Sequence, residues 1–332
     1  MYVGTQLSSE QYAIYGQEYL RQLAQLGVKH VSVDPLGPAK NWDRDCLLKH
    51  LEVIDNCGLI LDMIQLPMTS HPIEKSESKH IMLGKNPERD REIDLICELI
   101  EMLSEVGVGA VRYNCNLIGI PRTEDEIGRG GSRHSTYRED KLVNFDELSE
   151  AGHVNEDLFW ERIEYFLDRV VPVATANKVR MACHPHDPLT PVGYRGVTRV
   201  LGDADGLKRF VSFQESDYHG LNFCQGTIAE SMINPKEEMP AVIKWFGERG
   251  KIHNVHFRNI IGGRGSFMEV FLDNGDMDMT QSFKQYQDVG YKYMIMPDHV
   301  PHIDGKAPFE TGFAFCIGYI IALFQANGLD PY

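Results

Sequence analysis

Four apolar segments of the chain each end in a side chain of a type that binds transition metals. They are MACHP with His184, LNFCQG with Cys224, NVHFRN with His256 and YMIMPD with Asp298. Imidazole, thiolate and carboxylate together suit a borderline divalent cation such as Mn²⁺, Fe²⁺ or Zn²⁺. A single His in an apolar segment is more often a core residue, and free Cys is among the most buried residue types. Core packing gives no reason for all four to stand at strand ends, so we predict one shared metal site.

The donor set also bears on which metal is bound. If one or two coordination positions stay open for substrate oxygens, the site can be octahedral, which favours Mn²⁺ or Fe²⁺ over tetrahedral Zn²⁺. The spacing of the four residues is long-range, and the chain has no local metal motif such as HExxH. We therefore expect a divalent cation, Mn²⁺ or Fe²⁺, held by residues from separate elements.

Two further residues next to these ligands are candidates for chemistry. His299 directly follows Asp298 and must point differently from it on a regular strand, so we expect it to face across the site. There it would act as a general acid or base near neutral pH, the alternative being a supporting or surface histidine. Arg258 is expensive to bury unpaired, so a substrate carboxylate is one partner and an acidic residue of a neighbouring strand is the other.

Other polar residues follow the same segments. Asn114 and Asn116 end another apolar segment and are candidates for binding substrate hydroxyls. His186 and Asp187 lie just past His184 and would support the metal ligands. In GDMDM the aspartates are more simply explained as helix caps. The chain contains no GxGxxG, P-loop or GxSxG motif, so no nucleotide or serine-hydrolase signature is present.

The elements that must position these residues alternate along the chain. The expected strands are 2–5, 28–34, 59–66, 110–116, 179–184, 221–225, 252–258 and 293–298. The expected helices are 9–26, 41–56, 90–106, 156–177, 205–215, 235–249, 279–289 and 312–326. A glycine repeatedly follows a helix and precedes a strand, as a helix C-terminus requires. Eight strands alternating with eight helices predict an α/β fold, a (β/α)8 TIM barrel.

One segment leaves the strand count open. MEVFLD, at 268–273, also resembles a strand, and we expect it to be a hairpin arm after the seventh strand. The alternative begins the barrel at Val28 and makes MEVFLD its seventh strand. Two long connections, about 67–89 and 117–153, follow strands and so belong to the carboxyl face, where barrel active sites form. With no repeat or linker, we expect residues 1–332 to form a single TIM-barrel domain.

Composition limits the partners. The 332 residues carry a formal net charge of −15, which argues against nucleic acid or an anionic membrane surface as a partner. Seven scattered cysteines without a CxxC pair, and an N-terminus without a signal-peptide pattern, indicate a reducing, cytoplasmic location. The apolar stretch FAFCIGYIIALFQA is shorter than the ~20 residues a membrane span needs, so we expect a buried helix. We also expect a homo-oligomer, a dimer or larger.

Several motifs recur in the order of one known family. From about residue 80 to 300 they are IMLGKNPERDREI, YNCN, PRT at 121–123, MACHPHDP, CQGT, VHFRN, GDMDM and PDH. In these the chain resembles the mannonate dehydratases, metal-dependent lyases of hexuronate breakdown with a xylose isomerase-like TIM barrel. The first 75 residues match only loosely.

The resemblance implies roles for particular residues. His184, Cys224, His256 and Asp298 would be the metal ligands, and His299 a catalytic acid or base. Arg258, in the HFRN stretch, would help to hold substrate. We also expect substrate binding by Asn259, which follows it, and by Asn114 at the end of its strand. The implied reaction removes water from D-mannonate and gives 2-keto-3-deoxy-D-gluconate.

Two positions depart from the family pattern. His186 stands where the family usually has Asp after His-Pro, and Phe313 follows Gly312 where the family has a tyrosine implicated in proton transfer. Two alternatives therefore remain. One is an isomerase or epimerase acting on a sugar or sugar acid at the same metal. The other is a non-catalytic paralogue that binds metal or sugar acid, which the missing tyrosine favours.

Overall fold

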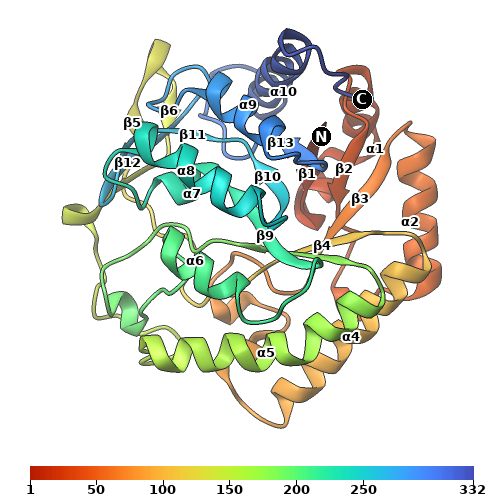
Figure 1. The fold of residues 1–332 in the computed structure, drawn as a ribbon, viewed down its shortest axis with the longest axis vertical. Coiled ribbons are helices and arrows are strands. Elements are labelled where there is room, and N and C mark those ends of the chain that lie inside the picture. Colours follow the sequence, from red (N-terminus) through yellow and green to blue (C-terminus); the bar gives the residue numbers. More distant parts are fainter.

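The computed structural model describes residues 1–332, and its centre is a closed barrel of eight parallel strands (Figure 1). Around the barrel the strands run in the order β1-β13-β10-β9-β8-β4-β3-β2. They are β1 (Tyr2–Leu7), β2 (His30–Val33), β3 (Ile60–Gln65), β4 (Ala110–Asn114), β8 (Arg180–His184), β9 (His219–Cys224), β10 (Ile252–His256) and β13 (Met294–Met296). The predicted barrel is confirmed. The alternative count from Val28 is wrong, because β1 pairs with both β13 and β2 and closes the barrel.

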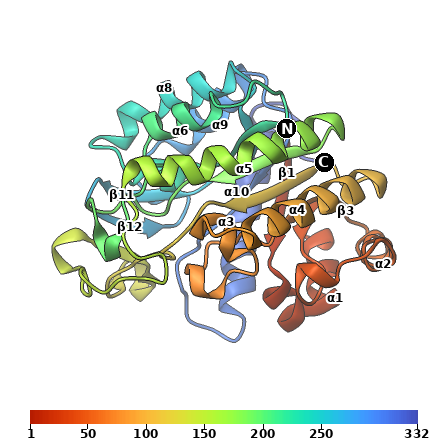
Figure 2. The ribbon, with the colours of Figure 1, turned by 90° about the horizontal axis from the view of Figure 1, so that it is seen from below.

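Helices surround the barrel, and Figure 2 shows α4 and α5 lying side by side along one flank. The helices are α1 (Ser9–Gln25), α2 (Arg44–Asn56), α3 (Lys79–Leu83), α4 (Glu88–Glu105), α5 (Glu156–Ala176), α6 (Ala204–Val211), α7 (Gln225–Ala229), α8 (Pro235–Gly247), α9 (Met279–Asp288) and α10 (Pro308–Ala326). Several begin at a side-chain cap, as Ser8 does for α1 and Asp278 does for α9. The capping role expected in GDMDM is therefore observed at Asp278.

Apolar side chains fill the lower part of the barrel. This buried cluster consists of Met63, Ala110, Ala182, Met294 and Met296. Side chains alternate across a strand, so the residues two positions further on face the same interior near its carboxyl end. Those residues are Gln65, Arg112, His184 and Asp298. The interior of the barrel thus has an apolar lower part, with a polar layer above it at the carboxyl ends of the strands.

The most apolar helix, α10, is a barrel helix. By length and composition it is the one helix that passes the test for a membrane span. Ile317, Ile320 and Phe324 on it are fully buried, and the helix packs against β1 and β13. One face of the predicted helix is therefore buried, while Phe315 on it is exposed.

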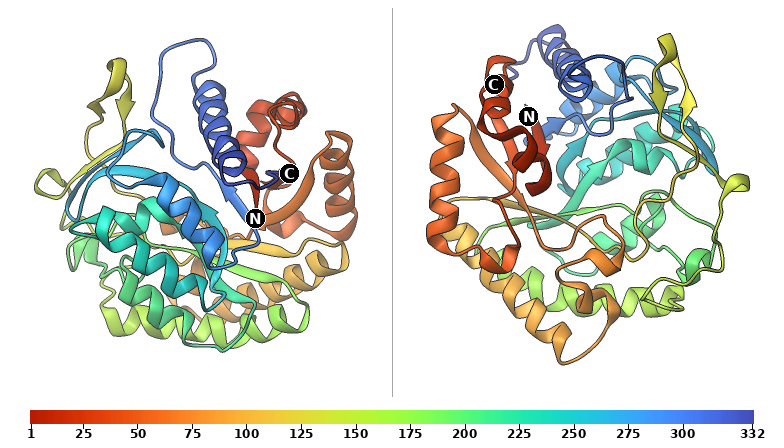
Figure 3. Two further views of the ribbon diagram at one scale, coloured as in Figure 1. Left: turned by 45° about the horizontal axis from the view of Figure 1, so that its top comes forward. Right: turned by 180° about the vertical axis from the view of Figure 1, so that it is seen from behind.

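The two long connections carry structure of their own on the carboxyl side. The first, after β3, contains η2 (Ile73–Lys75) and α3. The second, after β4, contains β5 (Glu126–Ile127), η3 (Arg129–Gly131), β6 (Arg133–His134), β7 (Thr136–Arg138) and η4 (Glu139–Lys141). The β5–β6 hairpin projects from the molecule (Figure 3).

The segment MEVFLD belongs to a small sheet outside the barrel. β12 (Ser266–Val270) pairs antiparallel with β11 (Asn259–Gly263) and, on its other edge, with β7. The predicted hairpin arm after the seventh strand is confirmed. We call β7, β11 and β12 the loop sheet. It joins two loops that are more than a hundred residues apart in the sequence.

Candidate metal centre

The structure brings together the four predicted metal ligands from four barrel strands. The ligand atoms of His184, Cys224, His256 and Asp298 all lie within 4.8 Å of one another. The register explains this, because Cys224 and His256 are directly paired on β9 and β10. Asp298 follows Met296, which is paired with His256. Adjacent parallel strands thus end at one level and present their last polar side chains to one point.

The contacts inside this cluster are close and buried. Asp298 Oδ2 lies 3.2 Å from His256 Nδ1 and 3.7 Å from Cys224 Sγ. The rings of His184 and His256 have centroids 5.3 Å apart. Cys224, His256 and Asp298 are all buried. Water is therefore largely excluded from three of the four ligands.

Hydrogen bonds orient both imidazoles for metal binding. His184 Nδ1 lies 2.7 Å from the Pro185 carbonyl oxygen and donates to it, which leaves Nε2 for the cluster. His256 Nε2 lies 3.2 Å from Gln6 Oε1, while its buried Nδ1 has no hydrogen-bond partner and faces Asp298. A ligating histidine characteristically donates its other N–H in this way. The residues present therefore fit a bound divalent cation.

Charge in the cluster also favours metal binding. Burial raises the pKa of the Cys224 thiol, but Arg258 and His256 outweigh burial and leave the pKa below its usual value. Burial likewise disfavours ionised Asp298, yet His256 and His299 hold the pKa of that carboxyl well below its usual range. Thiolate and carboxylate are the forms that bind metals. Both anionic ligands are thus prepared in the folded chain.

His299 stands at the edge of the cluster, between two carboxylates. Its Nδ1 lies 2.9 Å from both carboxylate oxygens of Glu269, and its Nε2 lies 3.8 Å from Asp298 Oδ2. Burial lowers the pKa of His299, but Glu269 and Asp298 outweigh burial and raise the pKa to about 10. The imidazole is therefore protonated at neutral pH, with Nδ1–H on Glu269 and Nε2–H towards the cluster.

Five charged side chains lie behind His299 and form what we call the charge nest. They are Arg122, Asp187, Glu230, Arg258 and Glu269. Arg258 is 1% exposed and contacts Glu269 at 2.6 Å, Glu230 at 2.8 Å and Asp187 at 3.3 Å. Arg122 contacts Asp187 at 2.5 Å and Glu269 at 2.5 Å. The structure thus gives Arg258 acidic protein partners, the alternative to the predicted substrate carboxylate.

The charge nest is not a second metal centre. Asp187, Glu269 and His299 offer ligand atoms within 4.8 Å of one another. The guanidinium groups of Arg122 and Arg258 already occupy the space between these carboxylates. A further cation there would be repelled by both arginines.

The two predicted substrate-binding asparagines differ in their surroundings. Asn114 lines a small cavity together with the predicted metal ligand His184. Asn259 is buried at the start of β11 and uses its amide on backbone groups. Its Nδ2 donates to the carbonyls of Leu272 and Met277, and its Oδ1 accepts from the N–H groups of Ile260 and Met277. All four hydrogen-bonding positions are filled, so we propose a structural role for Asn259 in place of substrate binding.

The two departures from the family motifs are also explained locally. His186 is buried, with Nε2 2.8 Å from the Cys115 carbonyl and Nδ1 3.1 Å from the Leu201 N–H. It joins two loops rather than touching the metal ligands. Phe313 is 9% exposed, and the centroid of its ring lies 4.4 Å from the centroid of the Phe309 ring.

Sequence reasoning overlooked the polar residues on the other half of the barrel. These are Gln6, Asp34, Gln65 and Arg112, from β1 to β4. Gln6 Nε2 donates to Asp298 Oδ1 at 3.2 Å, so it belongs to the metal cluster. The signal was available, because a polar residue also stands at or near the carboxyl end of each of these strands.

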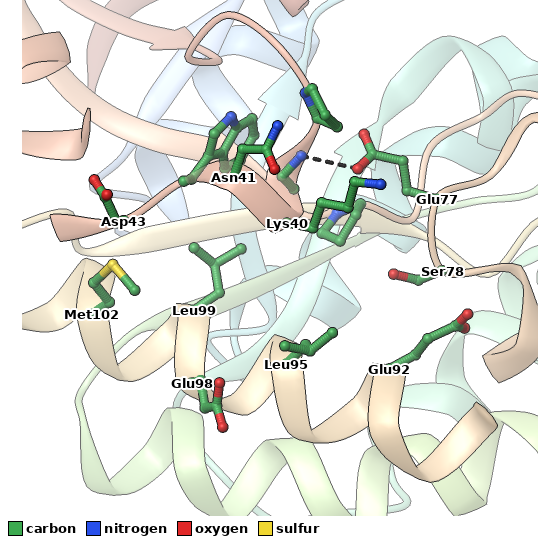
Figure 4. Close-up of a pocket in the computed structure, with 14 residues that line it drawn as sticks. Lys40, Asn41, Asp43, Glu77, Ser78, Glu92, Leu95, Glu98, Leu99 and Met102 are labelled. Carbon is green, nitrogen blue, oxygen red and sulfur yellow. Dashed lines mark hydrogen bonds between the residues drawn. The ribbon is translucent and has the colours of Figure 1, made fainter. Parts of the chain in front are cut away.

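A hollow on the outer side of the barrel lies away from this cluster. It measures about 670 Å³ and is formed by η1 (Ala39–Asn41), the segment after it and the outer face of α4 (Figure 4). Leu95, Leu99 and Met102 form its apolar side, and Glu77 accepts from the Ala39 N–H at 2.9 Å. None of the four metal-type ligands lines it.

The fold and the cluster together define a class of protein. A (β/α)8 barrel with imidazole, thiolate and carboxylate groups together at its carboxyl end is a xylose isomerase-like barrel with side chains that could hold a metal ion. Solved structures agree on the fold: a xylose isomerase domain protein from Planctomyces limnophilus covers 98% of this chain and 96% of its own, with a TM-score of 0.60 at 14% identity. The model of the D-mannonate dehydratase (UxuA) family matches residues 131–330, and the chain belongs to that family.

Individual relatives extend over nearly the whole chain. The mannonate dehydratase of Thermotoga petrophila is 29% identical and is aligned over 94% of this chain and 96% of its own. Mannonate dehydratase 2 of Halalkalibacterium halodurans is 28% identical and is aligned over 87% of this chain and 88% of its own. The crystal structure of mannonate dehydratase from Streptococcus suis covers 100% of this chain and 97% of its own, with a TM-score of 0.82 at 22% identity.

Proposed function

We propose that this chain is a hydro-lyase that dehydrates D-mannonate to 2-keto-3-deoxy-D-gluconate, a step of hexuronate breakdown. The observation that carries the proposal is the cluster of His184, Cys224, His256 and Asp298 with His299 beside it. Membership of the D-mannonate dehydratase family and the names of the relatives support the same reaction.

His184, Cys224, His256 and Asp298 would hold one divalent cation, which we propose to be Mn²⁺ or Fe²⁺. When bound, the cation would supply Lewis-acid polarisation of a substrate carboxylate and its neighbouring hydroxyl, which makes the adjacent C–H group more acidic. Gln6 and Pro185 fix the two ligand imidazoles through hydrogen bonds. The ligand set mixes soft and hard donors, as a redox-capable or borderline cation requires.

His299 supplies the acid of the reaction. Glu269 accepts its Nδ1–H, so the second proton is held at Nε2, on the side of Asp298. A protonated imidazole there donates to a departing hydroxyl group, which leaves as water. Arg258 and Arg122 keep the Glu269 carboxylate in place while it supports the imidazolium charge. Asn114, beside His184, is positioned to bind a substrate hydroxyl.

We further propose that the enzyme acts in the cytoplasm as a homo-oligomer. All seven cysteines are free, which suits a reducing compartment. Sedimentation of the purified protein tests the oligomeric state.

The reaction is tested by incubating the purified, Mn²⁺-loaded protein with D-mannonate and following the 2-keto product. Product formation with loss of water supports the proposal. Interconversion of a sugar or sugar acid without water loss would show an isomerase or epimerase. Stoichiometric binding of metal without dehydration or interconversion of any sugar or sugar acid would show a non-catalytic binding protein.

A further inference from the structure

A polar cleft of about 460 Å³ lies over the half of the barrel that holds no metal-type ligand. Its floor is formed by side chains at the carboxyl ends of β1 to β4, and its wall by the loop after β3. Its polar lining includes Gln6, Asp34, Gln65, Ser70, Lys75 and Arg112. The four metal-type ligands all come from the other half, on β8, β9, β10 and the end of β13.

An ion pair forms the floor of this cleft. Arg112 Nη2 lies 3.0 Å from Asp34 Oδ2, and its Nε donates to the Ser32 hydroxyl at 3.0 Å. Gln65 accepts from Arg112 through its side chain and donates its backbone N–H to Asp34 Oδ1 at 2.8 Å. The pair is therefore held in one geometry. Both side chains line the cleft, and each keeps hydrogen-bonding capacity beyond these contacts.

The cleft is continuous with the metal cluster at two points. Gln6 lines the cleft and donates to Asp298 Oδ1 at 3.2 Å. Ser70 lines both the cleft and the small cavity that contains Asn114 and His184. A molecule held at the metal cluster by one end would therefore extend its other end over the Asp34–Arg112 pair.

We propose that this cleft binds the uncharged, hydroxyl-bearing tail of the substrate, on the Asp34–Arg112 pair, and so selects monocarboxylic polyhydroxy acids. A fixed carboxylate and guanidinium offer acceptors and donors side by side, as neighbouring hydroxyl groups require. This inference rests on the proposed function, because it takes the carboxylate end of the substrate to lie at the metal.

The charges around the cleft disfavour substrates whose far end carries a negative charge. Asp34, Glu10 and Glu77 line it against the cations Arg112 and Lys75, so the lining carries no net positive charge. Arg112 is already paired with Asp34, which leaves Lys75 as the cation of the lining without an ion pair. A phosphate or a second carboxylate at the far end of the substrate would still meet three carboxylates against two cations. The site thus rejects phosphorylated hexonates and dicarboxylic sugar acids of the same length.

Calorimetric titration of the Mn²⁺-loaded protein tests the inference without requiring turnover. Three ligands are compared: D-mannonate, a 6-phosphohexonate, and the four-carbon trihydroxy acid with the same configuration at C2 and C3. The unaltered protein is expected to bind D-mannonate at least about tenfold more tightly than the 6-phosphohexonate. In Asp34→Asn the affinity for D-mannonate falls about 10- to 100-fold, as for loss of a charged hydrogen bond, while that for the four-carbon acid stays within about twofold.

A matched variant separates the cleft from general damage to the barrel. Asp62→Asn alters a carboxylate on β3 that accepts from the Tyr2 hydroxyl at 3.0 Å and does not line the cleft. It is expected to leave all three affinities unchanged. The comparison of ligands on the unaltered protein needs no variant to fold, and a 6-phosphohexonate that binds as tightly as D-mannonate overturns the inference.

The remaining outcomes are distinguishable. If D-mannonate is dehydrated but Asp34→Asn weakens both acids equally or neither, the tail site is wrong and the reaction stands. If D-mannonate binds with the expected pattern but is not dehydrated, the reaction is wrong and the tail site stands. Failure of the unaltered protein to bind any hexonate overturns both.

Discussion

The Nδ1 atom of His299 lies 2.9 Å from both carboxylate oxygens of Glu269. Glu269 belongs to β12 of the loop sheet, whereas His299 follows the last barrel strand. A carboxylate on one imidazole nitrogen fixes which proton the other nitrogen presents. The loop sheet therefore sets the orientation and charge of the candidate catalytic imidazole, although it contributes no metal ligand.

Glu269→Gln is expected to lower kcat about 100-fold and to change KM by less than about threefold. Without the carboxylate, the pKa of His299 falls from its raised value, so the alkaline limb of the kcat profile moves to lower pH. Steady-state kinetics between pH 6 and pH 10 measure both effects.

The matched control is Glu126→Gln, which neutralises a carboxylate on β5 that pairs with Arg138 outside the site. It should leave kcat and the pH profile unchanged. A Glu269→Gln enzyme with lower activity but an unshifted alkaline limb would show that Glu269 only stabilises the loop.

Metal binding is expected to stabilise the fold through Cys224. A ligand present at a thousandfold excess over its Kd stabilises by about 4 kcal/mol, so Mn²⁺ should raise the Tm of the chelator-treated protein by several degrees. In Cys224→Ser this rise should be lost, and in Cys224→Ser with His256→Ala stoichiometric metal should be absent by elemental analysis. Cys183→Ser, a buried cysteine of β8 outside the cluster, is the control. Metal retained by the double variant would refute the ligand assignment.

Phe313→Tyr is expected to change kcat by less than about threefold. The Phe313 ring is buried against Phe309, which itself stacks on Tyr15 of α1, so a new hydroxyl would join an aromatic cluster rather than the substrate. Steady-state assays of D-mannonate turnover measure the effect, with Phe309→Tyr as the neighbouring control. A large gain in rate would show instead that this position reaches the substrate during turnover.

Acid is expected to destabilise the fold through three buried histidines. Burial lowers the pKa of His186 and of His253 to about 3, and that of His219 to about 4. The unfolded chain binds these protons near pH 6.5, whereas the folded chain does not, so stability is lost as pH falls from about 6.5 to about 4. Each histidine contributes a slope of roughly 1.4 kcal/mol per pH unit in that window.

Urea unfolding of the metal-free protein at pH 7, 6 and 5 measures this slope. His219→Asn should reduce the pH dependence of the unfolding free energy by about one proton, or roughly 1.4 kcal/mol per pH unit. His153→Asn, at an exposed position, should leave the slope unchanged. A slope that does not respond to His219→Asn would contradict the assignment.

Local patterns in the sequence were sufficient to predict the barrel and its metal cluster. Strand periodicity and helix-terminal glycines located all eight strands. The positions of His184, Cys224, His256 and Asp298 at strand ends predicted that these side chains come together, and they do, while their role as metal ligands stays a prediction. These inferences need only neighbours in sequence and the rule that parallel strands end at one face. The family resemblance pointed to the same residues independently.

Contacts between distant loops could not be predicted in this way. The partners of Arg258 come from the loop after β8, from the residue after α7 and from the loop sheet, so periodicity gives no sign of them. Asn259 was expected to bind substrate because it stands beside Arg258 in HFRN, yet its amide is used by backbone groups of its own loop. The Asp34–Arg112 pair joins residues that are 78 positions apart in the sequence, so no local pattern predicts it.

The metal cluster lies at the seam where the first and last strands of the barrel meet. Gln6 of β1 donates to Asp298 at a sequence separation of 292 residues, and β1 pairs with β13 at Tyr2 and Val3. During synthesis the chain emerges from its N-terminus, at roughly 5 to 20 residues per second, so this seam stays open until β13 has left the ribosome. The four metal-type side chains therefore come together only after residue 298 has been synthesised, so a cation that needs all four can bind only after that point.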